Sequence, residues 1–219
     1  MMRYDIVLFD LDGTLTDPEI GICRSIQYAL EKGGKSVGPM ESYHPWIGPP
    51  LLWSFQTYAG VSREEAMTLM GYYRERFSTI GLFENKVYPG IPELLAELKE
   101  RGIKIAVATG KPTVFSQQIL EHFELAKYVD YVSGISLDHE PTDKCENILR
   151  ALSALGTADK ASAVMVGDRN QDADGAKMAG IDFLGVLYGY GDQLELANAG
   201  AKRIARDVPE LRHMLMENV

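Results

Sequence analysis

Short apolar runs recur along the chain, and segments with helical spacing of their apolar residues separate them. The runs cover residues 6–9, 103–108, 163–166 and 183–187, with weaker ones near 129–135 and 204. Helices are predicted around Leu94 and over residues 113–123, 143–155, 173–180 and 208–216. Strands without polar alternation suit a sheet that helices cover on both faces. We therefore predict an α/β fold with a mostly parallel sheet.

Residues 16–82 interrupt this alternation directly after the first apolar run, and residues 39–82 contain no convincing strand. A helix is predicted after Pro18, with Asp17 as its N-cap. Ser62 and Glu65 have the spacing of a capping box and predict another helix. We therefore predict an α/β core domain and an inserted all-helical domain, made of residues 1–15 with 83–219 and of residues 16–82.

Composition and charge exclude several classes of protein. The 219 residues are 46% hydrophobic, enough for a sizeable core, and the formal net charge is -9. Nucleic-acid backbones need clustered Lys and Arg, so no nucleic-acid partner is expected. No apolar stretch is long enough to span a membrane, and Asp5 interrupts the first one, unlike a signal peptide. Cys23 and Cys145 are far apart and expected to be reduced, so we expect a soluble cytoplasmic protein with no membrane partner.

Two carboxylates follow the first apolar run at the point where it ends. Asp10 and Asp12 are two residues apart, and Gly13 lets the backbone turn and approach a ligand. In open α/β sheets, ligands bind at the carboxyl ends of strands. Carboxylates held this close repel each other unless a cation lies between them, and a hard divalent metal is the simplest candidate. Alone, the pattern also fits an Asp-rich surface turn, so the rest of the chain must decide.

Two further runs end in polar residues that complement this pair. Thr109 follows the run 103–108, and Asp168 and Asp172 follow the run 163–166. Any one of them alone is usually a helix cap. Because the carboxyl ends of parallel strands meet at one edge of a sheet, we expect these residues to converge on one site.

The order and spacing of these residues resemble the haloacid dehalogenase superfamily over nearly the whole chain. Four segments are similar to its motifs: Asp10-Leu-Asp12-Gly13-Thr14, Ala108-Thr109-Gly110-Lys111-Pro112, Lys144, and Gly167-Asp168-Arg-Asn-Gln-Asp172. The resemblance implies a Rossmann-like core with a small helical cap domain, and a phosphatase activity. Three more segments resemble its phosphoglycolate phosphatase-like and 5'-nucleotidase-like branch: Trp46-Ile-Gly-Pro-Pro-Leu51, Val87-Tyr-Pro-Gly90 and Gly185-Val-Leu-Tyr-Gly-Tyr-Gly191.

The resemblance also implies a role for each site residue. Asp10 attacks phosphorus to form an aspartyl-phosphate, and Asp12 protonates the leaving group and then deprotonates water. Mg2+ is held by Asp10, the Asp12 backbone carbonyl and Asp168, and Asp172 supports the metal or orients Lys144. The transferred phosphoryl group is bound by Leu11, Asp12, Thr109, Gly110 and Lys144.

The implied partner is a small phosphate ester, of phosphoglycolate or nucleoside 5'-monophosphate type, which the cap domain selects. His44, Trp46 and Gly48 are candidates for lining the substrate pocket from the cap. Packing within the cap is the commoner role for such a cluster. The physiological substrate and the oligomeric state are not predicted.

Other functions remain open at this point. A phosphomutase or an inorganic pyrophosphatase would share all four motifs and differ in the cap. A dehalogenase is disfavoured because dehalogenases of the superfamily lack an acid at the position of Asp12. A non-enzymatic regulatory protein would be expected to lose Asp10, Asp12, Lys144 or Asp168, and all four are present.

Overall fold

The structure, a computed structural model, describes residues 4–137, 143–156 and 159–216. The chain forms two compact units, Met1–Asp17 with Val87–Val219 and Pro18–Lys86. Their boundaries fall at residues 17 and 86, where the sequence pattern placed them at 15 and 82. Within the described residues, no helix has the length and apolar composition that a membrane span requires.

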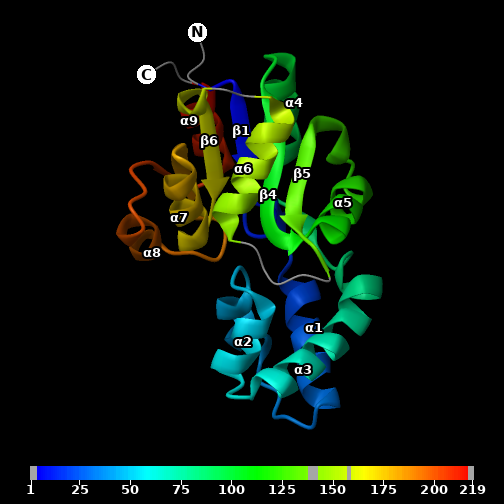
Figure 1. Ribbon diagram of the computed structural model, residues 1–219. Helices are drawn as coiled ribbons and strands as arrows, with labels where there is room; N and C mark the ends of the chain where they lie inside the picture. The colour runs from blue at the N-terminus through cyan, green and yellow to red at the C-terminus, as the bar shows by residue number, and fades with distance from the viewer. Residues whose placement is uncertain (1–3, 138–142, 157–158, 217–219) are drawn as a thin grey trace. The chain divides into compact units, whose positions relative to one another are not determined.

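The first unit is built on a six-stranded sheet, shown in Figure 1. Its strands, in spatial order, are β5 (Tyr131–Ile135), β4 (Lys104–Pro112), β1 (Ile6–Phe9), β6 (Ala163–Gly167), β7 (Asp182–Val186) and β8 (Ile204–Ala205). All neighbouring strands pair in parallel. Every residue of β1 and β6 is buried, as the absence of polar alternation predicts. The predicted α/β fold with a parallel sheet is confirmed.

Helices cover both faces of this sheet. They are α4 (Ile91–Glu100), α5 (Thr113–His122), α6 (Lys144–Leu155), α7 (Asn170–Ala179), α8 (Gln193–Asn198) and α9 (Val208–Met216). On one face, Ile148 of α6 and Ala176 of α7 share a core with Leu8 of β1. Phe9 and Val107 point to the opposite face and are fully buried too, so that face is also covered.

The second unit consists mainly of helices joined by short loops. It contains α1 (Glu19–Lys32), the 3-10 helix η1 (Met40–Trp46), α2 (Leu51–Tyr58), α3 (Arg63–Arg76) and the π-helical turn η2 (Phe77–Gly81). The predicted capping box is confirmed, since Glu65 N–H donates to Ser62 Oγ and Ser62 N–H donates to Glu65 Oε2. A Cβ on Gly21 would lie 2.0 Å from the Gly81 carbonyl oxygen, so glycine lets α1 approach η2 closely.

Several predicted boundaries are wrong. Asp17 is not the N-cap of α1; Pro18 occupies that position, and Asp17 lies in the short strand β2 (Thr16–Asp17), which pairs with β3 (Lys86–Val87). The carboxylate of Asp17 instead accepts a hydrogen bond from the Tyr190 hydroxyl. β4 continues past residue 108 to Pro112 with a register shift, and α7 begins at Asn170 rather than at 173.

Candidate active site

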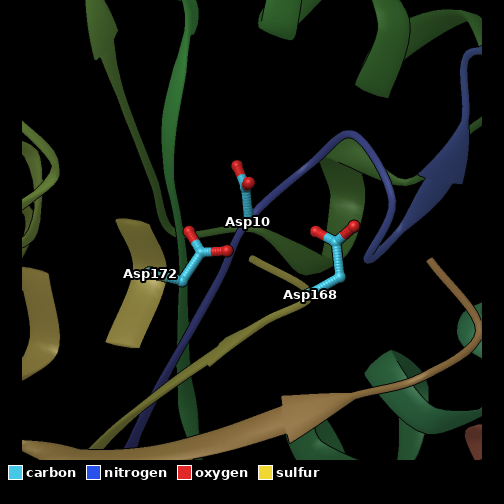
Figure 2. Close-up of side chains that lie close together, drawn as sticks. All are labelled: Asp10, Asp168 and Asp172. Carbon is cyan, nitrogen blue, oxygen red and sulfur yellow. The ribbon is translucent and has the colours of Figure 1, made fainter. Parts of the chain in front are cut away.

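Three buried carboxylates gather at the carboxyl edge of the sheet, as Figure 2 shows. Asp10 follows β1, Asp168 follows β6, and Asp172 lies in the first turn of α7. One oxygen from each lies within 4.8 Å of the others. The pairing of β1 with β6 therefore brings together residues that are far apart in the sequence.

Lys144 lies between two of these carboxylates. It is the first residue of α6, and Asp143 caps that helix by accepting a hydrogen bond from Glu146 N–H. Its ammonium nitrogen lies 3.0 Å from Asp10 Oδ1 and 2.7 Å from Asp172 Oδ1. Burial opposes its charge, but the two carboxylates prevail and raise the pKa of Lys144 above its usual value. The lysine is therefore a fixed cation within the site.

The carboxylate of Asp168 is held by neutral donors. Oδ2 accepts the Tyr190 N–H at 2.8 Å, and Oδ1 accepts the Thr14 hydroxyl at 3.4 Å. Burial, and then repulsion by Asp172 and Asp10, raises the pKa of Asp168 to about 8. Burial also raises the pKa of Asp172 to about 6, with Lys144 acting in the opposite direction. Negative charge is therefore crowded at this edge of the sheet.

The three carboxylates fit a divalent cation. They offer oxygen ligands from three rigid positions, and oxygen is what Mg2+ prefers. Burial is the main cause of the raised pKa values of Asp168 and Asp172, and repulsion between the carboxylates adds to it. A divalent cation among these oxygens would relieve that repulsion.

Asp12 forms an ion pair with Lys111, a residue to which the sequence analysis assigned no separate role. Lys111 is buried, and its Nζ lies 2.6 Å from Asp12 Oδ2. The other oxygen, Oδ1, is buried and has no hydrogen-bond partner among the described residues. Burial raises the pKa of Asp12, and Lys111 opposes that rise. The Thr-Gly-Lys sequence after the strand was the available signal for Lys111.

Thr109 is positioned from two sides. Its hydroxyl accepts the Lys111 N–H at 3.2 Å, and its carbonyl accepts the side-chain amide of Asn147 at 2.8 Å. Asn147 is fully buried, and the sequence analysis missed it. It follows Lys144 by three residues on α6, so the helical repeat places both on one face, which is the signal that could have found it.

The remaining predicted phosphate-binding groups are backbone positions. Leu11 N–H donates to Asp10 Oδ1 at 2.8 Å, and Gly110 is exposed after Thr109 in β4. Gly13 has a φ of 82°, and a Cβ there would lie 2.2 Å from Asp168 Oδ2. Only glycine therefore lets the loop after β1 approach Asp168 so closely.

Two of the three candidate substrate residues of the second unit, His44 and Trp46, make contacts within that unit. His44 Nε2 lies 2.6 Å from Glu19 Oε1. Trp46 is buried against aromatic rings, those of Tyr43, Phe55 and Tyr58. Gly48 has a φ of 108°, which favours glycine. A role for these residues in substrate choice stays a prediction.

The fold and the site together define a class of hydrolases. Its members have a parallel α/β core with a helical insertion after the first strand, and aspartates and a lysine at the carboxyl edge of the sheet. The chain belongs to the haloacid dehalogenase-like hydrolase family, whose model matches residues 7–186. It is a phosphatase of that family. The family membership that the motifs predicted is thus confirmed.

Three similar proteins illustrate this relationship. A 5'-nucleotidase of Pseudomonas aeruginosa is 41% identical, over 98% of this chain and 96% of its own. The tyrosine-protein kinase PtkA of Mycobacterium tuberculosis is 36% identical, over 96% of this chain and 72% of its own. A crystal structure described as a predicted phosphatase from Clostridium acetobutylicum is 46% identical, with a TM-score of 0.92 over 96% of this chain and 97% of its own.

Proposed function

We propose that the chain is a Mg2+-dependent phosphomonoesterase that hydrolyses a small phosphorylated metabolite through an aspartyl-phosphate on Asp10. The observation that carries the proposal is the joint placement of Asp10, Lys144 and Asp168 at one buried edge of the sheet. A carboxylate nucleophile, a fixed cation and a set of oxygen ligands are the parts that phosphoryl transfer needs.

Asp10 is arranged as a nucleophile. Its Oδ1 accepts the Leu11 N–H at 2.8 Å and pairs with Lys144, whereas Oδ2 has no hydrogen-bond or ion-pair partner among the described residues. In the proposed first step, an Asp10 oxygen forms a bond to phosphorus while the bond from phosphorus to the leaving oxygen breaks. Because Leu11 and Lys144 hold Oδ1, the carboxylate has a fixed orientation, which favours attack on phosphorus by Oδ2.

Asp12 is proposed as the acid and base. It gives a proton to the leaving oxygen and then takes one from the water that attacks phosphorus, which releases phosphate and restores Asp10. The raised pKa of Asp12 supports this role, because a carboxyl group must hold a proton in order to give it. Its unpartnered oxygen, Oδ1, supports the role as well.

Cationic and neutral donors are proposed to bind the phosphoryl oxygens. They are the Lys144 ammonium, the Thr109 hydroxyl and the backbone N–H groups of Leu11, Asp12 and Gly110. Mg2+ would be held by Asp10, Asp168 and the Asp12 carbonyl, with Asp172 in support, and would offset the charge of the phosphate. Donors fixed by the fold in this way stabilise charge that develops in the transition state.

The proposed substrate class is a nucleoside 5'-monophosphate, with phosphoglycolate next. The basis is similarity along nearly the whole chain to a protein named 5'-nucleotidase. The choice among phosphate esters is proposed to depend on the helical unit, where His44, Trp46 and Gly48 are the candidate residues.

The test measures phosphate release from nucleoside 5'-monophosphates, phosphoglycolate, sugar phosphates and pyrophosphate, with Mg2+ and with a chelator. Wild-type protein should turn over at least one monoester in Mg2+ alone, and Asp10→Asn should lower kcat by at least about 1000-fold. Asp5→Asn is the matched control, because it makes the same change in charge at the exposed start of β1 and should keep full activity. Turnover that survives in Asp10→Asn would rule out the aspartyl-phosphate, and pyrophosphate as the best substrate would replace the monoesterase assignment.

A further inference from the structure

The segment that follows β7 contacts the site at Asp168. We call residues 187–191, of sequence Leu-Tyr-Gly-Tyr-Gly, the tyrosine loop. The N–H of Tyr190 in this loop donates to Asp168 Oδ2 at 2.8 Å. The sequence of this segment marks the family resemblance but predicts no role for it.

The two glycines of the tyrosine loop leave no room between the loop and Asp168. A Cβ on Gly189 would lie 2.3 Å from the Gly13 carbonyl oxygen and 2.4 Å from Asp168 Oδ2. A Cβ on Gly191 would lie 1.8 Å from the Asp168 carbonyl oxygen. The backbone of the loop therefore lies directly against this carboxylate, and the position of the Tyr190 N–H depends on how the loop is held.

The hydroxyl groups of the loop hold it to the segment that follows β1. Tyr190 donates its hydroxyl proton to Asp17 Oδ1, and Tyr188 donates to the Thr14 carbonyl at 3.1 Å. Tyr88 supports Tyr188, with ring centroids 4.9 Å apart. Burial raises the pKa of Tyr188, so this hydroxyl keeps its proton and remains a donor. The loop thus has two side-chain anchors, on either side of Gly189.

We propose that Tyr190 is a positioning residue for the metal ligand Asp168. Its hydroxyl, bonded to Asp17, fixes the tyrosine loop, and its N–H then holds Asp168 Oδ2 in the orientation that the cation requires. The inference rests on the proposed function only in taking Asp168 as a ligand of Mg2+. Groups that orient a metal ligand typically change metal affinity by about 10–100-fold when they are removed.

The experiment measures the dissociation constant of Mg2+ by titration calorimetry, which needs no substrate and no turnover. Tyr190→Phe keeps the ring and removes the hydroxyl, and Asp17→Ala removes its acceptor. Each should weaken Mg2+ binding by about 10-fold. The double variant should be no weaker than either single variant, because both changes break the same hydrogen bond.

Tyr131→Phe is the matched control. Tyr131 is a half-buried tyrosine at the start of the edge strand β5, so its variant removes a hydroxyl from the same unit away from Asp168. It should bind Mg2+ as the wild type does. Tyr190→Phe and Asp17→Ala should melt somewhat below the wild type in chelator, because each loses one hydrogen bond. Both should remain folded at the temperature of the titration, so weaker Mg2+ binding is separated from unfolding.

Two results would overturn the inference, and they differ in what else they reject. Wild-type affinity in Tyr190→Phe, in a protein that hydrolyses phosphate esters with Mg2+, rejects the role of Tyr190 and leaves the proposed function standing. Wild-type affinity in Asp168→Asn rejects Asp168 as a ligand, and with it both the inference and the metal part of the proposed function.

Discussion

At the scale of the residue, Lys144 controls the charge balance of the site. It is the cation that lies within 3.0 Å of both Asp10 and Asp172. Lys144→Met leaves the carboxylates of Asp10 and Asp172 buried without their cation. Removing one partner of a buried ion pair lowers the free energy of unfolding by about 3–5 kcal/mol. Because Lys144 is proposed to bind the phosphoryl group, its loss should also lower kcat/KM by at least about 100-fold. Urea denaturation in chelator and phosphate release measure the two effects.

The control for this prediction is Lys177→Met. Lys177 is exposed on α7, so its replacement removes the same charge away from the buried carboxylates. It should change stability by no more than about 0.5 kcal/mol. If Lys144→Met were as stable and as active as Lys177→Met, Lys144 would not be the cation that balances Asp10 and Asp172.

The residues that could be predicted from sequence are those that directly follow an apolar run. Asp10, Thr109 and Asp168 gather because neighbouring parallel strands end at one edge, and the order of apolar runs already implies this. Lys111 and Tyr190 could not be placed in the same way. The contact of Lys111 with Asp12 depends on the register shift in β4, and that of Tyr190 on the path of a loop.

At the scale of the element, the capping box of α3 is open to a direct test. Ser62→Ala removes the hydroxyl that accepts Glu65 N–H at 3.2 Å and leaves that donor without its partner. Loss of an N-cap side chain costs about 1 kcal/mol, and the second unit should lose that much stability. Urea denaturation followed by circular dichroism measures the change.

The control for the capping box is Ser153→Ala. Ser153 is exposed within α6, where alanine is the better helix former, so stability should stay equal or rise slightly. A Ser62→Ala protein that is no less stable than Ser153→Ala would show that the cap adds nothing to α3.

Element type followed from periodicity wherever an element was long enough to show it. β1 and β6 were predicted because each is a continuous apolar run, buried on both faces. β2 has two residues and α8 has six, too few positions for a repeat, and both were missed. Asp17 had the residue type of an N-cap, but the pairing of β2 with β3 and the hydrogen bond from Tyr190 placed it elsewhere.

At the scale of the whole molecule, the helical insertion separates the catalytic core into two stretches of sequence. Met1–Asp17 supplies the site residues that follow β1, among them Asp10 and Asp12, and Val87–Val219 supplies Lys144, Asp168 and Asp172. The buried site therefore depends on pairing of β1 with β4 and β6, across the whole insertion. Anything that changes the charge at this edge of the sheet should change the stability of the first unit.

The stability without Mg2+ and the stabilisation by Mg2+ are predicted to depend on pH in opposite directions. The pKa values of Asp168 and Asp172 are raised to about 8 and about 6, so the folded chain holds these protons more tightly than the unfolded chain. In chelator, the free energy of unfolding should therefore fall as pH rises from about 5 to about 8. Stabilisation by Mg2+, which is proposed to bind the ionised carboxylates, should grow over the same range. Urea titrations at several pH values, with chelator or Mg2+, measure both trends, and Asp168→Asn should weaken each. In chelator, the free energy of unfolding of the wild type should fall more steeply with rising pH than that of Asp168→Asn. An equal or shallower fall in the wild type would contradict the crowding of charge on which the proposed metal site depends.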